Sequence, residues 1–349
     1  MTERIYKPNF IRLDKIKLLF FDIFYKNNKI YMIMPIYNTP ATPQNIVVKI
    51  NNTILKLVER HVKDSNEPAL IHIYEYISPP NTRVTVHIKL INNATMSCDL
   101  QHEYTCVNTP TDTYRFLALT TLFKNDYWLF PLFYNYYKEQ GVQHFYMYYN
   151  GTITPEISKI FNREDVTLIE WNFHYWNPRE IKYAHHAQMG QMHHALYKYG
   201  KDIYDYMVFC DFDEYLHIPK HKFTDSTAEI SSTKNTKIIP MNTSIHKFIK
   251  MNPNTDIFGF CNFWANTIDD NIPNTPYLPK KIIAVHEPCD YCERSKNIYK
   301  VSSINTIGIH QIGYDNMLMS ITDLHMYHFY KWSSKKHTIN NCTTIVDLS

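Results

Sequence analysis

Three acidic residues follow one apolar run near the middle of the chain. The run, YMVFC at 206–210, leads directly into Asp211, Asp213 and Glu214. If the strand continues through these positions, side-chain alternation puts Asp211 and Asp213 on one face and Phe212 on the other. Neighbouring carboxylates repel each other unless a cation lies between them, and Mg²⁺ or Mn²⁺ takes carboxylate and phosphate oxygens as ligands. The spacing therefore indicates a metal site of the kind that binds a diphosphate leaving group.

Two other interpretations of this cluster stay open. A solvated strand end produces the same pattern, and Asp-x-Asp phosphatases also place their nucleophile after an apolar strand. Against a phosphatase, Tyr215 stands where those enzymes have Thr or Val, and the motif lies deep in the chain. An EF-hand does not fit, because Leu216 and Lys222 occupy the positions that its loop reserves for Gly and Glu.

Strands and helices alternate along the chain from about residue 109 onward, which predicts an α/β unit with a largely parallel sheet. The expected strands are 116–123, 144–150, 166–171 and 206–210. One helix is expected at 128–141, ending at Gly141, and a second begins at Pro178 and ends at Gly200. The second helix has one predicted core face, formed by Ile181, Ala184, Gln188, Met192, Ala195 and Tyr199. The acids after 206–210 lie at the carboxyl end of a strand, where open α/β sheets bind ligands.

The first third of the chain has a different pattern. Short β-prone runs follow one another, separated by clusters of Asn, Pro and Thr, at the spacing typical of a sandwich. These runs cover residues 16–25, 29–37, 44–50, 69–77 and 83–91. We therefore expect an all-β, sandwich-like accessory domain at 1–108 and an α/β domain at 109–349, with a linker at 107–113. An exposed loop is expected at 221–243, where Ser, Thr, Lys and Asn dominate.

Composition and charge exclude several classes of protein. The 349 residues are 44% hydrophobic and 20% charged, which is typical of a folded globular protein. A net charge of +3 with intermixed signs offers no basic stripe for nucleic acid. No apolar run reaches the roughly 18 residues of a membrane-spanning helix, and the N-terminus has no signal-peptide core. A cytoplasmic protein with no nucleic-acid partner and no membrane span is therefore expected.

Residue usage adds two further expectations. With 28 Tyr and only 7 Gly, beside abundant Asn, Ile and Lys, the composition is typical of AT-rich coding, as in an AT-rich protist or a large DNA virus. A viral origin would place the protein in the host cytoplasm. The 7 cysteines are scattered and odd in number, so mostly reduced thiols are expected.

Four ordered blocks resemble glycosyltransferase family 92, a family of GT-A type, over roughly residues 114–335. The blocks are LFKNDYWLFPLFYNYYKEQGVQHFYMYYNGT, GQMHHALYKYGKDIYDYMVFCDFDEYLHIP, SKNIYKVSSINTIGIHQI and MYHFYKWSSKK. Two positions depart from the family pattern: Asp126-Tyr127 replaces an acid-containing turn, and Val301 replaces a proline. The order and number of the blocks carry the resemblance, since each block alone is modest.

The resemblance implies a GT-A nucleotide-diphospho-sugar transferase fold and transfer of a hexose, galactose from UDP-galactose in characterised members, with inversion. It implies Mn²⁺ or Mg²⁺ as cofactor, a UDP-linked donor, and a glycan or glycoprotein acceptor. The implied metal ligands are Asp211, Asp213 and His328, and the implied nucleotide-sugar contacts are Asp211, Lys296, Gln191 and Thr120. Asp211 would meet the ribose or a metal-bound water, Lys296 the diphosphate, and Gly190 would permit close packing. A non-catalytic carbohydrate-binding protein on the same fold is the alternative, and a homodimer is a candidate assembly.

An inverting transfer needs a carboxylate that deprotonates the acceptor hydroxyl. Asp269 and Asp270, in the loop after the strand DIFGFCNFW, are candidates for this base. The other loop acids considered are Glu287, Asp290 and Glu293. Trp264 just before the loop is either a core residue or a platform for an acceptor sugar.

Histidine and cysteine clusters complete the candidates. His286, Cys289 and Cys292 have spacing suited to zinc, but no fourth ligand is close in sequence, so loop thiols are the preferred interpretation. The pairs at 185–186 and 193–194 are too far apart along the helix for chelation, and we expect them to pack or face solvent. His310 fits a structural role and a site role equally well.

Overall fold

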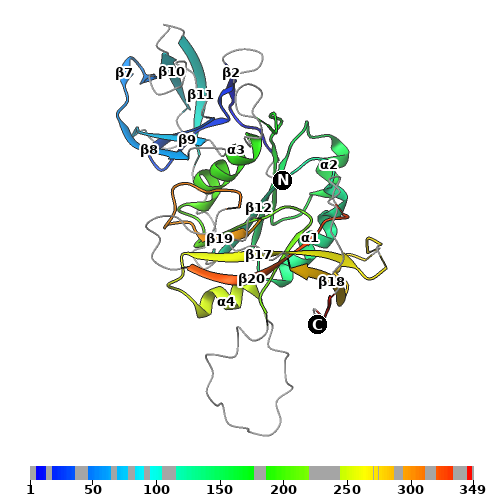
Figure 1. Ribbon diagram of the computed structural model, residues 1–349. Helices are drawn as coiled ribbons and strands as arrows, with labels where there is room; N and C mark the ends of the chain where they lie inside the picture. Colours follow the sequence, from blue (N-terminus) through cyan, green and yellow to red (C-terminus); the bar gives the residue numbers. More distant parts are fainter. Residues whose placement is uncertain are drawn as a thin grey trace.

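The computed structural model describes residues 5–12, 18–35, 46–63, 69–77, 83–89, 95–103, 115–176, 186–219, 244–269, 271–273, 275–286, 294–310, 320–332 and 344–347. The expected linker at 107–113 and the expected loop at 221–243 lie outside these residues. Within them the chain forms a mixed α/β fold with a large mixed sheet and few helices (Figure 1).

The large sheet contains 11 strands and joins a parallel half to an antiparallel half. The parallel half runs, in spatial order, β1 (Ile5–Tyr6), β14 (Val166–Glu170), β13 (His144–Tyr149), β12 (Leu117–Phe123) and β15 (Tyr206–Phe209). The antiparallel half continues through β19 (Lys296–Lys300), β17 (Ile257–Thr267), β18 (Lys281–His286) and β21 (Thr344–Asp347). β20 (Ser320–Phe329) pairs with β17 and with β16 (Glu214–His217). The strands predicted at 116–123, 144–150, 166–171 and 206–210 are confirmed to within two residues.

The helices of the parallel half begin and end at residues with clear local signals. Helix α1 (Phe130–Glu139) follows the short 3₁₀ turn η2 (Tyr127–Leu129) and gives way to Gly141, whose positive φ of 91° suits only glycine among common residues. Helix α2 (Pro155–Ile160) has Pro at its first position, and the preceding threonine side chain accepts the Ile157 N–H. Helix α4 (Ile245–Met251) begins after Ser244, whose side chain accepts the Lys247 N–H. The helix predicted at 128–141 is therefore confirmed.

The N-terminal region builds a second sheet of eight strands, in the order β7-β6-β10-β11-β4-β5-β9-β8. Its strands are β4 (Asp22–Lys26), β5 (Lys29–Met34), β6 (Val47–Ile50), β7 (Thr53–Ile54), β8 (Leu57–Lys63), β9 (Ala69–Glu75), β10 (Arg83–Lys89) and β11 (Thr95–Glu103). A separate pair, β2 (Ile11–Arg12) and β3 (Leu18–Phe20), precedes them. Positive φ angles at Asn27 and Asn28 make the tight turn between β4 and β5, as paired asparagines in a two-residue hairpin favour.

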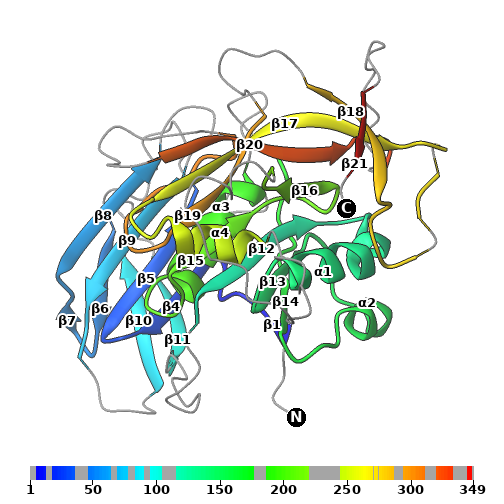
Figure 2. The ribbon, with the colours of Figure 1, turned by 90° about the horizontal axis from the view of Figure 1, so that it is seen from below.

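Helix α3 (Ala187–His194) continues as the π-helix η3 (Ala195–Gly200) and lies between the two sheets (Figures 1 and 2). All but one of its residues are buried, so the expectation of a single core face is wrong. The physical reason is that the N-terminal sheet covers the side that the sequence pattern assigns to solvent, and aromatic residues of both regions share one hydrophobic cluster. The predicted end at Gly200 is confirmed, whereas the predicted start at Pro178 lies outside the described residues.

Two further findings bear on sequence-based expectations. Cys210 is a buried free thiol, whereas Cys261 in β17 is disulfide-bonded and is thus an exception to the expectation of mostly reduced thiols. Among the residues that the structure describes, no helix has the length and apolar character needed to cross a membrane.

Candidate active site

Asp211 and Asp213 lie in a turn at the carboxyl end of β15, near the centre of the large sheet. The strand ends at Phe209, so the expectation that strand alternation orients the two acids is wrong. A hydrogen bond of 3.1 Å from the Glu214 N–H to the Asp211 carbonyl closes the turn. Phe212 packs into the core, while Asp211 and Asp213 line one cavity. The two acids thus reach a common cavity through a turn and not through the pleat of a strand.

Lys296, the first residue of β19, is the cation that pairs with this turn. Its Nζ lies 2.9 Å from Asp211 Oδ2 and 3.2 Å from Glu214 Oε2, with the lysine side chain only 3% exposed. Burial alone lowers the pKa of Lys296, but the two carboxylates outweigh it and hold the pKa above its ordinary value. The lysine charge is therefore matched by protein carboxylates at the base of the site.

His328 approaches Asp213 from the neighbouring strand. β16 and β20 are antiparallel, which places His328 opposite Glu214 and brings His328 Nε2 to 3.3 Å from Asp213 Oδ2. Burial raises the pKa of Asp213, but His328 outweighs it and the net pKa is lowered. The same contact raises the pKa of His328 against the effect of burial. The family resemblance named both residues as metal ligands, and the structure brings them into contact although more than a hundred residues separate them in sequence.

Glu214 stabilises this turn through hydrogen bonds of its side chain and its backbone. Its Oε2 accepts the Asp211 backbone N–H at 2.7 Å, and its backbone carbonyl accepts the Tyr137 hydroxyl at 2.9 Å. Burial raises the pKa of this glutamate to about 7, even though Lys296 opposes the shift. Glu214 therefore orders the turn that follows β15.

Gln188 is a site residue that the search for catalytic motifs missed. Its Nε2 lies 3.4 Å from Asp211 Oδ1, and its Oε1 accepts the Tyr175 hydroxyl at 2.8 Å. The only signal in the sequence was a glutamine at a position of the helix predicted to face the core. One turn further along α3, Gln191 donates to Thr120 Oγ1 at 2.7 Å. Gln191 and Thr120 are almost fully buried and do not line the large cavity described below, but they line a small pocket that also includes Gln188 and Asp211.

A cavity of about 920 Å³ lies over the carboxyl ends of β12, β13, β14 and β15. Its lining includes the acids Asp211, Asp213 and Glu214 together with Gln188 and His328. Three cations also line it, namely Arg12, Lys124 and Arg294. Within the described part of the chain, none of the three forms an ion pair with a carboxylate. The cavity lining therefore combines carboxylates with cations that have no carboxylate partner among the described residues.

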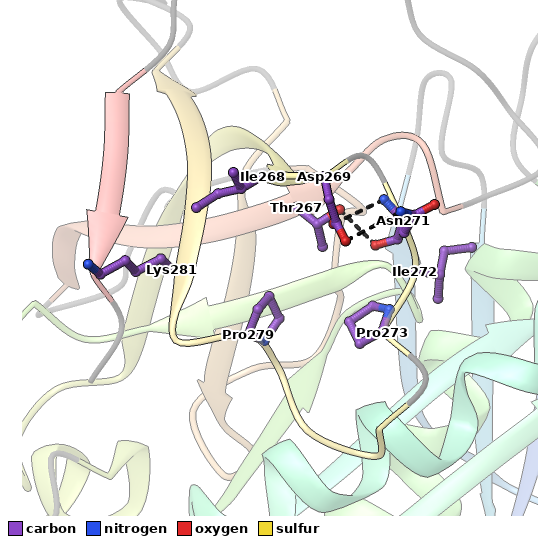
Figure 3. A pocket seen from close by; sticks show the side chains of 8 residues that line it. All are labelled: Thr267, Ile268, Asp269, Asn271, Ile272, Pro273, Pro279 and Lys281. Atoms are coloured by element: carbon purple, nitrogen blue, oxygen red, sulfur yellow. Dashed lines mark hydrogen bonds between the residues drawn. The ribbon is translucent and has the colours of Figure 1, made fainter.

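Asp269, a predicted catalytic base, lines a different hollow of about 620 Å³ at the turn after β17 (Figure 3). Its carboxylate is exposed and accepts hydrogen bonds from the Asn271 backbone and side chain, both at 3.3 Å. Lys281 lies across the same hollow. The structure does not bring Asp269 together with Asp211 and Asp213, and Asp270 lies outside the described residues.

The remaining sequence candidates fall into three groups. Trp264 is buried against His328, with ring centroids 4.6 Å apart, and His310 lines the large cavity. His186, His193 and His194 are all buried, so of the two expected environments, packing and solvent exposure, the structure shows packing for these three. Outside the described residues, or described by backbone alone, lie His185, His286, Glu287, Cys289, Asp290, Cys292 and Glu293.

Comparison with known proteins identifies the family to which the chain belongs. Residues 117–347 match the family model described as Glycosyltransferase family 92. Because the match covers well over half of the chain, the chain belongs to glycosyltransferase family 92. No curated protein matches the chain. Family membership makes the protein an enzyme that transfers a sugar from a nucleotide-sugar donor to a glycan acceptor, and the mixed α/β sheet agrees with that class.

Proposed function

We propose that residues 109–349 form a GT-A type domain that transfers a hexose from a UDP-linked donor in a metal-dependent reaction, and that residues 1–108 form an accessory β domain. The single observation that carries the proposal is that Asp213 and His328 contact each other and both line the large cavity. That cavity lies beyond the carboxyl ends of parallel strands, where α/β sheets bind nucleotides. Its volume of about 920 Å³ lies within the range of small-molecule sites.

The side chains of Asp213 and His328 are suited to bind a divalent metal ion. Asp213 supplies a carboxylate oxygen and His328 an imidazole nitrogen, and these atoms are 3.3 Å apart. Two neighbouring ligands with bonds of about 2.1 Å to one ion are separated by about this distance. The described residues hold no cluster of three or more His, Cys, Asp and Glu side chains suited to a metal. Such a two-ligand site suits Mg²⁺ or Mn²⁺, which binds through one or two side chains plus substrate phosphates and water.

A bound ion would neutralise the charge that develops on the departing diphosphate. Asp211, the third predicted ligand, is held by Lys296 and Gln188, so this chain uses it to fix the turn that presents Asp213. The charge of Lys296 is already balanced by two protein carboxylates. We therefore assign the binding of the donor's phosphates to Arg12, Lys124 and Arg294, which also line the cavity.

Galactose as the transferred sugar and inversion at the anomeric carbon are part of the proposal and derive from the family resemblance. An inverting transfer produces an acceptor linkage of opposite anomeric configuration to the donor, which proton NMR of the product distinguishes directly. A panel of UDP-sugars identifies the sugar, because the correct donor gives the highest kcat/KM.

The test of donor and metal binding is thermal unfolding with UDP-galactose, with and without Mn²⁺. We expect the donor to raise Tm only when Mn²⁺ is present, because a ligand that binds the folded state alone stabilises it. Asp213→Asn should lose this shift, while Glu156→Gln, an exposed acid of α2 outside the cavity, should keep it. Equal shifts with Mn²⁺ and with EDTA would contradict the metal assignment. A phosphatase would ignore nucleotide sugars, and a non-catalytic protein would bind glycan without releasing UDP.

A further inference from the structure

Helix α3 is held in place by residues outside the family-matched region. Gly190 of α3 faces Phe21, and a Cβ atom added at Gly190 would lie 2.6 Å from the Phe21 ring. Gly190 thus permits the close packing that the sequence suggested. Phe21 also stacks on Trp171, with ring centroids 5.5 Å apart and planes at 19°. Trp171 donates from its Nε1 to the Ala187 carbonyl at 2.9 Å. The Phe21 ring therefore supports both the helix and the segment after β14.

Asp22, the next residue, binds the same helix through its side chain. Asp22 Oδ2 lies 2.7 Å from His194 Nε2, and both side chains are fully buried. Tyr6 donates its hydroxyl to Asp22 at 2.7 Å, and the Tyr148 hydroxyl lies 2.6 Å from the other ring nitrogen of His194. The aspartate thus joins the N-terminal sheet, α3 and strand β13 in one buried polar network.

The opposite side of α3 faces the sugar-transfer site. Gln188 reaches Asp211 at 3.4 Å and accepts the Tyr175 hydroxyl, while Gln191 binds Thr120 in β12. α3 contacts β5 and β9 of the N-terminal sheet as well as β12 of the large sheet, and Figure 1 shows it between them. The contact of Gln188 with Asp211 is at the long limit of a hydrogen bond, so a small displacement of the helix removes it.

We propose that Phe21 and Asp22 are positioning residues for sugar transfer. They fix α3 at the position in which Gln188 contacts Asp211. Asp211, paired with Lys296, in turn fixes the turn that carries Asp213. The N-terminal sheet is then a structural part of the donor site and not an independent module. This inference rests on the proposed function in one respect, namely that the site which α3 positions is the sugar-transfer site.

The test is a complementary pair of substitutions. Gly190→Ala pushes a methyl group into Phe21 and should reduce kcat/KM for the donor by about tenfold to a hundredfold, since displacements below 1 Å at a reacting site have effects of this size. Phe21→Leu removes the ring edge, so the double variant should recover most of the loss. Gly200→Ala at the end of the same helix is the control, because its added Cβ meets Val301 at an ordinary 3.4 Å.

A second readout does not depend on activity. Hydrogen exchange of the backbone at 206–217 should accelerate in Gly190→Ala, return towards wild type in the double variant, and stay unchanged in Gly200→Ala. A Gly190→Ala protein with wild-type exchange in this segment, or a double variant that shows no recovery, overturns the proposal. An inactive wild type with the expected exchange pattern would instead overturn the proposed function and leave the positioning role supported. If Gly190→Ala does not fold, Asp22→Asn replaces it, with the same exchange segment as readout.

Discussion

The buried His193 of helix α3 predicts a specific sensitivity to acid. Its Nδ1 donates to the Met189 carbonyl at 2.8 Å, and its Nε2 accepts the Ile307 backbone N–H at 3.1 Å. These two partners require the neutral ring with its proton on Nδ1, because a second proton on Nε2 would face another N–H. The side chain is fully buried, so water cannot replace either partner.

Burial lowers the pKa of His193 from 6.5 to about 4, with Lys63 and His61 of β8 acting in the same direction and the Met189 carbonyl opposing. The folded-state pKa lies below the unfolded one, so the unfolded protein binds the extra proton first as the pH falls. Stability from this group is therefore complete above about pH 6.5 and is lost on acidification towards about pH 4. A shift of this size corresponds to about 3 kcal/mol over the whole window, and to about 2 kcal/mol between pH 7 and pH 5.

The assay is urea unfolding of wild type and His193→Gln at about pH 7 and about pH 5. Glutamine keeps an acceptor for the Ile307 N–H but does not titrate, so the stability difference between the two pH values should be smaller by about 2 kcal/mol. His87→Gln, an exposed position of β10, should leave the difference unchanged. An identical pH dependence in wild type and His193→Gln would refute the argument that the buried neutral imidazole controls acid sensitivity.

Two further predictions concern single side chains. Lys26 donates to three backbone carbonyls at the end of η3, at 2.8, 3.2 and 3.0 Å, so Lys26→Met should lower the free energy of unfolding by about 3 kcal/mol in urea titrations. Lys7→Met on the surface should change it by less than about 0.5 kcal/mol, and equal effects would contradict this role of Lys26. Alkylation of the denatured, unreduced protein should modify Cys210 but not Cys261, as peptide mass spectrometry can determine. Modification of Cys261 in the absence of reductant would contradict the disulfide bond at this residue.

Local signals predicted the elements of the parallel half well. Apolar runs flanked by polar residues predicted β12, β13, β14 and β15, and the glycine at 141 marked the end of α1. These features depend on residues that are neighbours in sequence, so they can be predicted without knowledge of the fold. The environment of α3 was not predictable in the same way. The sequence left packing and solvent exposure open for its histidines, whereas in the structure Asp22, more than a hundred residues earlier, is the buried partner of His194.

The candidate site was predictable only in part. The pair of aspartates after an apolar strand was visible in the sequence, and the structure places both at one cavity. Lys296 looked like a diphosphate ligand, because nothing local indicates that the pairing of β15 with β19 aligns it with two carboxylates. Gln188 was missed for a related reason, since its contact depends on where the helix lies above the strand end. The loop acid Asp269 was predicted from chemistry alone and lies in another hollow.

The measurement that tests the central claim most directly is metal-dependent release of UDP from a UDP-sugar in the presence of a glycan acceptor. With Mn²⁺, wild type and Glu156→Gln should turn over equally, and both should lose activity in excess EDTA. Asp213→Asn and His328→Ala should each lose at least about a hundredfold in kcat/KM while keeping a cooperative unfolding transition. Full activity in EDTA, or wild-type activity in folded Asp213→Asn, would contradict the assignment of Asp213 and His328 as the metal site of this glycosyltransferase.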